Sequence, residues 1–347
     1  MKHKFTIFRL HFTAPLHLGN EREDYAESLG IIHSDSLYAA LTAALFKVGW
    51  QPPEKFEGHL GFTISSLFPF YQKEKEPPVY FFPKSRKQEI MEEGLLEDHK
   101  KIKKIKWLDK EFFEDYARGK SMQKLYSRGK TGKKDENKYH KGDYFTQASI
   151  PENFISKQVF PRVAVSRNGK DDADPFYMER LFFKDNSGMF FLAEGDTTLL
   201  KKALNILEQE GIGTDRNVGN GFFKCENDTL ELELPDDSRY QMNLSLFLPA
   251  EKEQLKEQLK RQLDEHAAYA FKKRGGWVST PPYNTIRKNR IYMFEEGSIF
   301  KANANKPITD GRIVNLKPDT STLPANLQGI HDIWRNGEAI FIPFKPS

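Results

Sequence analysis

Residues 211–223 have the sequence Gly-Ile-Gly-Thr-Asp-Arg-Asn-Val-Gly-Asn-Gly-Phe-Phe and follow a predicted amphipathic helix at 197–210. A dinucleotide-binding glycine motif follows a strand and opens a helix, so this order excludes that motif. A P-loop is excluded because the only Gly-Lys-Thr, at 129–131, has Lys124 where the motif requires glycine. Two interpretations remain: a glycine-rich loop that approaches a phosphodiester backbone, or a helix C-cap followed by a tight turn into a strand.

If the loop binds RNA, its polar and glycine residues are the candidates for contact. An arginine here can pair with phosphate, and exposed backbone N–H groups can add hydrogen bonds. The candidates are Gly213, Arg216, Asn217, Gly219 and Gly221.

Hydrophobic periodicity before the loop predicts strands and helices that alternate along the chain. Residues 4–13 alternate with period two, which predicts a strand, and Ser34 is placed to cap a helix that runs to about Gly49. Leu37, Leu41, Ala44, Leu45 and Val48 are predicted to share the buried face of this helix. Further strands are predicted near 62–71, 79–83, 158–166, 176–183 and 189–193.

A second unit of the same kind begins near Arg239. Its pattern predicts a strand at 240–249, a helix at 251–273 that ends in a turn at 274–277, and strands at 290–294, 298–301 and 339–344. Strand, helix and paired strands thus occur twice. The sequence therefore predicts an α+β fold with two fused ferredoxin-like (RRM-like) domains, at 1–235 and 236–347.

Charge is distributed unevenly along the 347 residues. The net charge of +4 identifies no partner, but 118–141 holds nine basic and two acidic residues, a local charge of +7. This block belongs to a basic stretch at 84–147 that is long for an ordinary connection. We predict that it is an insertion, a solvated loop facing RNA or a protein partner, and not a separate catalytic domain.

Composition excludes several classes of protein. Cys225 is the only cysteine, so an intrachain disulfide and a cysteine-based zinc site are impossible. The nine histidines are scattered, and we expect no metal and no cofactor. Neither a signal peptide nor an apolar span of membrane length is apparent, so we expect a cytoplasmic protein that does not contact a membrane.

Two histidines, one before a predicted helix and one in a predicted loop, are candidates for contact with RNA. His33, beside Ser34, stands before a predicted helix, where it could act as a general base on RNA, bind phosphate, or order the turn. His17 and Gly19, in the loop after the first strand, are candidates for ordering that loop or contacting RNA.

A second basic patch lies in the C-terminal half. Arg274, Gly275, Gly276 and Trp277 are followed by Arg287, Lys288 and Arg290. Trp277 could stack on an unpaired base while the cations neutralise phosphates, or it could pack in the core after the Gly-Gly pair.

The order of several short motifs is similar to a known family. The helix followed by 211–223 resembles the glycine-rich loop of the RAMP superfamily, the RNA-binding proteins of CRISPR systems. More narrowly, the chain resembles the fourth subunit of the type III-A (Csm) effector complex. That likeness rests on Thr-Ala-Pro-Leu-His-Leu-Gly at 13–19 and on the motifs at 32–37, 161–167, 176–181, 273–277, 296–300 and 334–339. It covers nearly the whole chain except 84–147.

This resemblance implies a non-catalytic subunit that holds the repeat-derived 5′ tag of the guide RNA (crRNA). Its implied partners are the crRNA, the target RNA, a large polymerase-like subunit and the backbone RAMP subunit. A β-hairpin thumb is implied at 159–183, where Arg162 and Arg167 could reach the RNA backbone, although an ordinary sheet edge would give the same pattern. The alternative is a metal-independent, Cas6-like endoribonuclease that processes precursor crRNA with His33 as its base.

Overall fold

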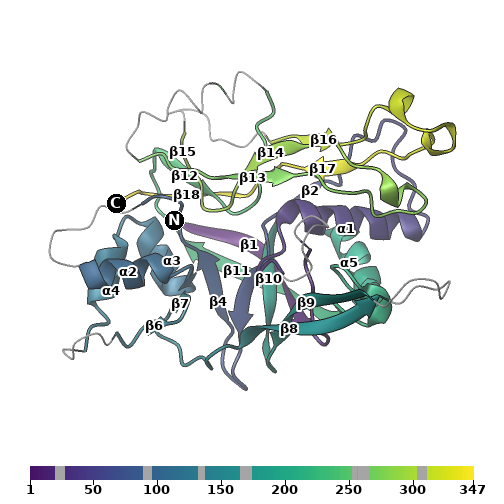
Figure 1. The fold of residues 1–347 in the computed structure, drawn as a ribbon. Coiled ribbons are helices and arrows are strands. Elements are labelled where there is room, and N and C mark those ends of the chain that lie inside the picture. Colours follow the sequence, from purple (N-terminus) through teal and green to yellow (C-terminus); the bar gives the residue numbers. More distant parts are fainter. Residues whose placement is uncertain are drawn as a thin grey trace.

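The computed structural model describes residues 1–19, 28–88, 96–131, 137–164, 174–251, 256, 266–302 and 311–347. Its architecture is mixed α/β, with one large sheet and few helices (Figure 1). The predicted α+β class is confirmed at this level.

The large sheet has the strand order β11-β1-β10-β3-β4-β5-β7-β6, and β2 also pairs with β10. Within the described residues its strand pairs are antiparallel, apart from the parallel pair β5 with β7. Its strands are β1 (Lys2–Phe12), β2 (Phe62–Ile64), β3 (Phe68–Tyr71), β4 (Val79–Pro83), β5 (Trp107–Asp109), β6 (His140–Lys141), β7 (Tyr144–Phe145), β10 (Ser187–Gly195) and β11 (Phe223–Glu233).

Strand β1 is central because both of its faces are covered. Phe5 and Ile7 pack in one hydrophobic cluster, and Phe8 and Leu10 pack in the other. The alternation that the sequence shows over 4–13 is therefore the alternation between two cores, not between core and solvent.

Helices α1 (Ser34–Lys47) and α5 (Thr198–Glu210) cover one face of this sheet (Figure 1). Leu37, Leu41, Ala44 and Leu45 are buried as predicted, but Val48 follows the helix end and is 49% exposed. Ser34 is not the cap that the sequence predicted. His33 occupies the N-cap position but its side chain caps no backbone N–H of the helix, and the Ser34 hydroxyl accepts a hydrogen bond from the Leu246 backbone N–H instead.

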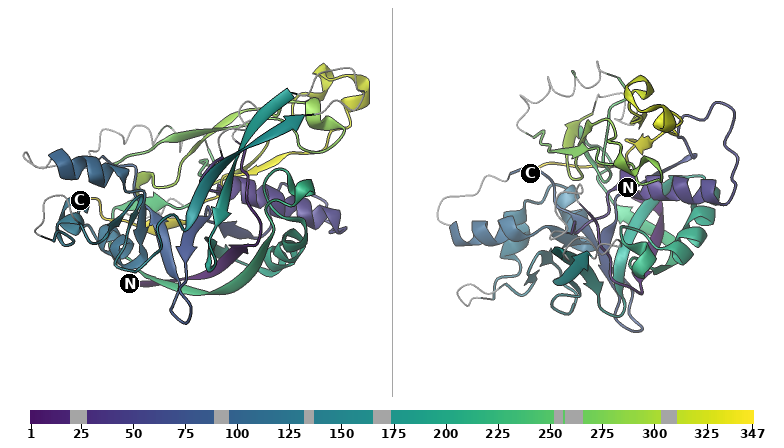
Figure 2. Two further views of the ribbon diagram at one scale, coloured as in Figure 1. Left: turned by 60° about the horizontal axis from the view of Figure 1, so that its bottom comes forward. Right: turned by 45° about the vertical axis from the view of Figure 1, so that its right-hand side comes forward.

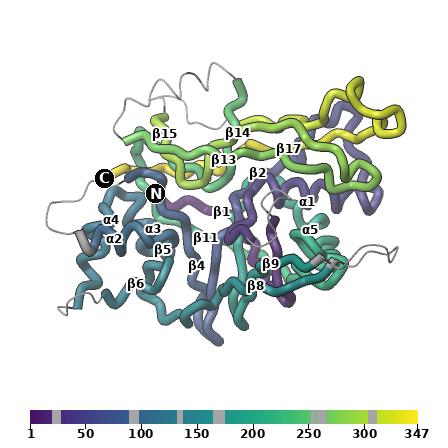
Figure 3. The backbone as a smooth tube through the Cα atoms, viewed as in Figure 1, coloured from purple at the N-terminus to yellow at the C-terminus, as the bar shows by residue number. Residues whose placement is uncertain are grey.

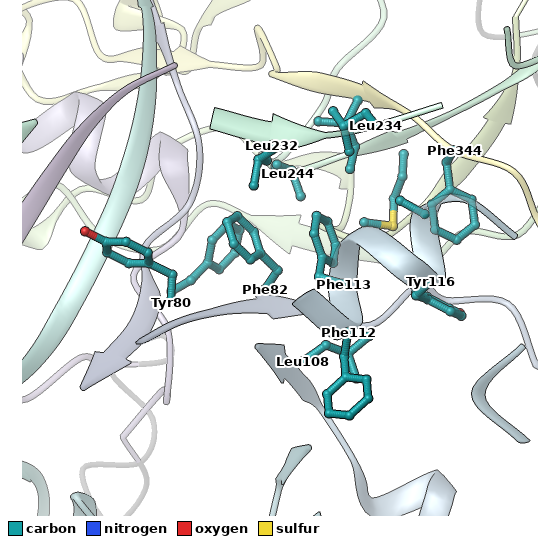
Figure 4. Close-up of a cluster of buried hydrophobic side chains, with 14 of the residues drawn as sticks. Tyr80, Phe82, Leu108, Phe112, Phe113, Tyr116, Leu232, Leu234, Leu244 and Phe344 are labelled. Atoms are coloured by element: carbon teal, nitrogen blue, oxygen red, sulfur yellow. The ribbon is translucent and has the colours of Figure 1, made fainter. Parts of the chain in front are cut away.

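The basic stretch is a folded part of the core, which corrects the expectation of a solvated loop. It adds β5, β7 and β6 to the sheet and contributes the helices α2 (Leu96–Lys104), α3 (Lys110–Ala117) and α4 (Met122–Ser127). Figure 4 shows Phe112, Phe113 and Tyr116 among the buried side chains of the first hydrophobic cluster. This structural role could not be predicted from the sequence, because the aromatic residues of the stretch are interspersed with lysines.

The cations of this stretch meet acids that a local count misses. Arg118, Lys120 and Arg128 all lie within 2.9 Å of the Asp115 carboxylate, and Lys130 pairs with Asp98. Burial alone would raise the pKa of Asp115, but these three cations lower it to about 2. Much of the apparent +7 is therefore neutralised within the protein.

A long antiparallel hairpin, β8 (Ile155–Ala164) and β9 (Asp174–Phe183), occupies the place predicted for the thumb. Its register runs from Ile155 opposite Phe183 to Ala164 opposite Asp174. In the left view of Figure 2 its two teal strands cross the molecule as an extended arm.

The second half contains short strands in three small sheets. These are β15-β12-β18, β13-β14 and β16-β17. Their bounds are β12 (Tyr240–Asn243), β13 (Phe271–Arg274), β14 (Ile291–Phe294), β15 (Ile299–Lys301), β16 (Ile313–Asn315), β17 (Trp334–Asn336) and β18 (Phe341–Pro343).

The prediction of a helix at 251–273 is wrong at its C-terminal end. Residues 252–255 and 257–265 of the predicted helix 251–273 lie outside the described residues. Phe271–Arg274, however, is a strand that pairs with β14, so 274–277 is not a helix-terminating turn. Lys272, Lys273 and Arg274 are compatible with a helix or a strand. The segment is a strand because it pairs with Ile291–Phe294.

The two halves share one core. Met242, Leu244, Ile340 and Ile342 pack in the same hydrophobic cluster as Phe5 and Ile7 of β1. Backbone bonds also cross between the halves, because the Ser66 N–H donates to the Leu244 carbonyl.

Candidate nucleic-acid interface

The glycine-rich loop 211–223 packs against the opening loop of the chain. The Thr214 N–H donates to the His17 carbonyl at 3.1 Å, and the Gly221 N–H donates to the Pro15 carbonyl at 2.8 Å. His17 is fully buried, and its Nδ1 lies 2.5 Å from the Glu179 carbonyl of β9. His17 therefore ties the opening loop, the glycine-rich loop and the base of the hairpin together.

Most glycines of this loop serve internal packing. A Cβ at Gly221 (φ +77°) would collide with the Ile212 backbone, and one at Gly213 (φ +92°) would lie 2.6 Å from the His17 carbonyl oxygen. The expectation that these two glycines admit a phosphodiester backbone is therefore not supported by their surroundings. Gly219 differs, because no atom lies within 4 Å of the position that its Cβ would occupy.

The outward part of the loop is a short 3-10 turn, Arg216–Val218, closed by Gly219. Arg216, Asn217, Val218 and Gly219 are all exposed. The Arg216 side chain is 41% exposed, and its guanidinium lies 3.7 Å from the Glu210 carboxylate, which Lys47 approaches more closely, at 2.6 Å. Arg216 is thus a weakly held surface cation, available to an anion.

The hairpin carries exposed apolar side chains along its outer part. Val159, Phe160, Val163 and Tyr177 are between 37% and 62% exposed. Arg162 is half-buried on β8, and Arg180 lies over the Phe160 ring at 5.8 Å. Arg167 lies outside the described residues. Gly19 remains at the described end of the opening loop, where it bridges to Ser28.

His33 and Ser34 lie at the junction of the two halves. Only 5% of His33 is exposed, and its Nδ1 is 2.8 Å from the Glu296 carboxylate, which also accepts a bond from the Ser66 hydroxyl. Burial would raise the pKa of Glu296, but His33 and Ser66 outweigh this effect and lower it. A side chain enclosed in this way presents no surface to an RNA strand, so the geometry does not support the general-base alternative.

Arg274 also belongs to the junction. Its Nε lies 2.7 Å from the Asp35 carboxylate, and its Nη2 donates to the Ser36 hydroxyl at 2.6 Å. Arg335 approaches the same carboxylate at 3.3 Å. Burial would raise the pKa of Asp35, but the two guanidinium groups lower it to about 2. Two of the three Arg274 guanidinium nitrogens are therefore engaged within the chain, and this arrangement gives no support to the expected phosphate contact.

Gly275, Gly276 and Trp277 continue the strand pairing of β13 past Arg274. The Lys288 N–H donates to the Gly276 carbonyl, Trp277 forms a bridge with Arg287, and the Arg287 guanidinium lies 4.8 Å from the Trp277 ring centroid. Trp277 is half-buried and outside the hydrophobic clusters, so it is not the core residue that one interpretation required.

Sequence reasoning missed the residues on which this junction depends. Asp35, Arg335 and Glu296 are buried charges, far apart in the sequence, and only their pairing across the halves marks them out. A charged residue is expected at the surface, and its burial becomes apparent only when the fold brings an oppositely charged partner next to it.

The described part of the chain shows neither a metal-binding group of side chains nor a membrane-spanning helix. Among those residues, no three His, Cys, Asp or Glu side chains are grouped so that they could hold a metal ion. No helix among them combines the length and apolar character needed to cross a bilayer.

Comparison with known proteins gives a consistent result. The family model of the CRISPR Csm4 C-terminal domain matches residues 236–344. The CRISPR system Cms protein Csm4 of Thermococcus onnurineus (strain NA1) is 26% identical over 290 residues, covering 78% of this chain and 82% of the relative. The protein of the same name from Streptococcus thermophilus is 24% identical over 294 residues, covering 82% and 84%.

Solved structures show the same fold. A crystal structure of a Csm1-Csm4 cassette in complex with cA4 contains a chain with a TM-score of 0.58, at 20% identity and 99% coverage of both chains. A crystal structure of a Csm3-Csm4 subcomplex of the type III-A interference complex contains one with a TM-score of 0.53, at 19% identity, covering 99% of this chain and all of the other.

Proposed function

Because the chain belongs to the Csm4 family of CRISPR proteins, we propose that it is a non-catalytic crRNA-binding subunit of a type III-A effector complex. In this role it anchors the repeat-derived 5′ tag of the guide. The observation that carries the proposal is the extent of the likeness, which runs along both halves of the chain and not through one RNA-binding motif.

The arrangement around His17 supports the proposal. One buried histidine connects the glycine-rich loop to the base of the hairpin, so the exposed Arg216–Val218 turn and the β8-β9 arm have a fixed relative position. A guide strand held by its backbone needs such a rigid pair of contacts, because the protein senses shape and ends while base pairing identifies the target. In this proposal Arg216, Asn217 and Gly219 contact the guide, and the arm, with Arg162, contacts the guide–target duplex.

The proposed partners follow from the relatives. Solved Csm4 chains are found with Csm1 and with Csm3, and we propose equivalent partners for this chain: a large polymerase-like subunit and a backbone RAMP subunit.

We also propose that the architecture is two fused ferredoxin-like domains divided at 235/236. In the first half, the antiparallel order β11-β1-β10-β3, with α1 after β1 and α5 after β10, is the order of a ferredoxin-like sheet. The Csm4 C-terminal family model begins at residue 236, which supports the boundary.

The test is to tag the protein in its native host, purify it gently and sequence the small RNA that accompanies it. We expect guides that share one repeat-derived 5′ tag, with a large polymerase-like subunit in the same fraction. Unprocessed repeat precursors, or no RNA, would contradict the proposal.

A further inference from the structure

The β13-β14 pair is the start of a longer two-stranded ribbon, formed by residues 271–278 and 286–294. Beyond the register Phe271–Arg274 with Ile291–Phe294, the Lys288 N–H donates to the Gly276 carbonyl and the Val278 N–H donates to the Ile286 carbonyl. Trp277 and Arg287 form a bridge between these bonds. Figure 3 shows β13 and β14 (green) in the upper part of the molecule.

The ribbon has an inner and an outer face, because side chains alternate along each strand. Val278, Ile286 and Met293 are buried, and Arg274 reaches Asp35, so these residues define the inner face. Their neighbours in the strands project to the opposite side. This side also carries Phe271 opposite Phe294, which is buried, so the outer face proper begins with Lys273 opposite Tyr292 and continues to Trp277 opposite Arg287.

Aromatic and basic side chains alternate on this outer face. Tyr292 is 63% exposed, which is unusual for a large ring on a strand. The stem of Arg290 lies across Gly275, between the Tyr292 and Trp277 positions, since a Cβ on Gly275 would lie 3.1 Å from Arg290 Cγ. Arg287 stacks on Trp277 at the far end.

The charge of the segment is entirely positive. Residues 266–294 contain six lysines and arginines and no aspartate or glutamate. Three of the six lie on the inner side: Arg274, which pairs with Asp35, Lys272, which is opposite the buried Met293, and the half-buried Lys288. The other three, Lys273, Arg287 and Arg290, lie on the outer face and add positive charge next to the exposed Tyr292 ring.

We propose that the outer face of the 271–294 ribbon binds a single-stranded segment of RNA, with an unpaired base stacked on Tyr292 and phosphates beside Lys273 and Arg290. This inference rests on the proposed RNA-binding function and adds a site outside the glycine-rich loop and the hairpin. An exposed ring accepts any base, and flanking cations follow the backbone, so the site favours single strands over duplexes without reading sequence. Because the segment carries lysines and arginines and no acid, its charge favours a polyanion such as RNA.

The test measures binding of a fluorescently labelled 12-nucleotide RNA, single-stranded or annealed to its complement, to the full-length protein. We expect Tyr292→Ala to weaken single-strand binding about tenfold and Tyr292→Phe to leave it near the wild-type value, because the ring and not the hydroxyl is used. Arg290→Ala should reduce the salt dependence by roughly one counterion. The control is Phe46→Ala, which removes a ring that is 44% exposed on α1 and should change neither quantity.

Two outcomes would overturn the inference. If Tyr292→Ala leaves single-strand affinity unchanged while the purified complex still contains guide RNA, the site is wrong and the proposed function stands. If Tyr292→Ala instead leaves RNA affinity unchanged and releases a protein subunit from the complex, the ribbon is a protein contact. Loss of guide RNA from the wild-type complex would instead contradict the proposed function itself.

Discussion

The Asp35 carboxylate at the start of α1 lies 2.7 Å from Nε of Arg274 at the end of β13, and this pair joins the two halves of the chain. Arg335 of β17 approaches the same carboxylate, so one buried anion holds two cations that are 61 positions apart in the sequence. Because removing a guanidinium group from water costs free energy unless a counterion compensates it, the relative position of the halves depends on Asp35.

Asp35→Asn should therefore destabilise the protein by about 3 kcal/mol, since it leaves the buried Arg335 and the largely buried Arg274 without a charge partner. Urea unfolding of the full-length protein measures the difference. Asp237→Asn, at an exposed acid, is the control and should stay within about 0.5 kcal/mol of the wild type. Adding Arg335→Met to Asp35→Asn should recover part of the loss; no recovery would argue against this electrostatic explanation.

The same carboxylate should give the protein a specific sensitivity to acid. Its pKa is about 2 in the folded chain and 3.8 for an unperturbed aspartate, so the stabilisation is complete above pH 4 and is lost as the pH falls toward 2. The difference is worth about 2 kcal/mol. We expect the stability gap between wild type and Asp35→Asn to narrow over this range; a constant gap would show that Asp35 acts through packing alone.

The sequence was sufficient for elements whose pattern is local. The alternation over 4–13 and the helical face of Leu37, Leu41 and Leu45 correctly located β1 and α1, because burial on one face of a single element leaves a periodic trace. It failed at Phe271–Arg274, where strand or helix depends on a partner about twenty residues away. It also failed to predict that Arg274 pairs with Asp35, because no residue near Arg274 in the sequence indicates this distant partner.

The glycine-rich loop shows the same limit at the level of function. Its composition indicated close backbone approach, which is correct for Gly213 and Gly221, but the approaching backbone belongs to the chain's own opening loop. Sequence can indicate that a glycine is required without indicating what it faces.

Lys288 should make stability depend on pH in the alkaline range. Burial of its ammonium beside Arg335 and Arg274 lowers its pKa to about 7, whereas an unperturbed lysine has a pKa of 10.5. Between these values the unfolded chain binds a proton that the folded chain lacks, so stability rises with pH. Lys288→Met should stabilise the protein at pH 7, with a gain that shrinks toward pH 9 in thermal unfolding. Lys202→Met, at an exposed lysine of α5, should give no such trend.

His33→Ala tests whether the buried histidine is structural or catalytic. Removal of the imidazole leaves the buried Glu296 carboxylate with the Ser66 hydroxyl but without His33, and we expect a loss of about 3 kcal/mol in unfolding free energy. Repeat RNA incubated in EDTA should remain intact with the wild type as well as with the variant. Cleavage by the wild type that the variant lacks would restore the endoribonuclease alternative.

Arg216→Ala tests the exposed turn of the glycine-rich loop. Among the described residues the guanidinium has one ionic contact, at 3.7 Å with Glu210, and no glycine packing depends on it, so the fold should be unaffected. If this cation pairs with a guide phosphate, its removal should weaken guide RNA binding about tenfold and lower the salt dependence by roughly one counterion. Lys202→Ala removes an exposed cation from the neighbouring helix and should have little effect on either quantity. Equal losses in both variants would mean that the turn adds only diffuse positive charge, and the guide would then be anchored by the β8-β9 arm without a specific phosphate contact at Arg216.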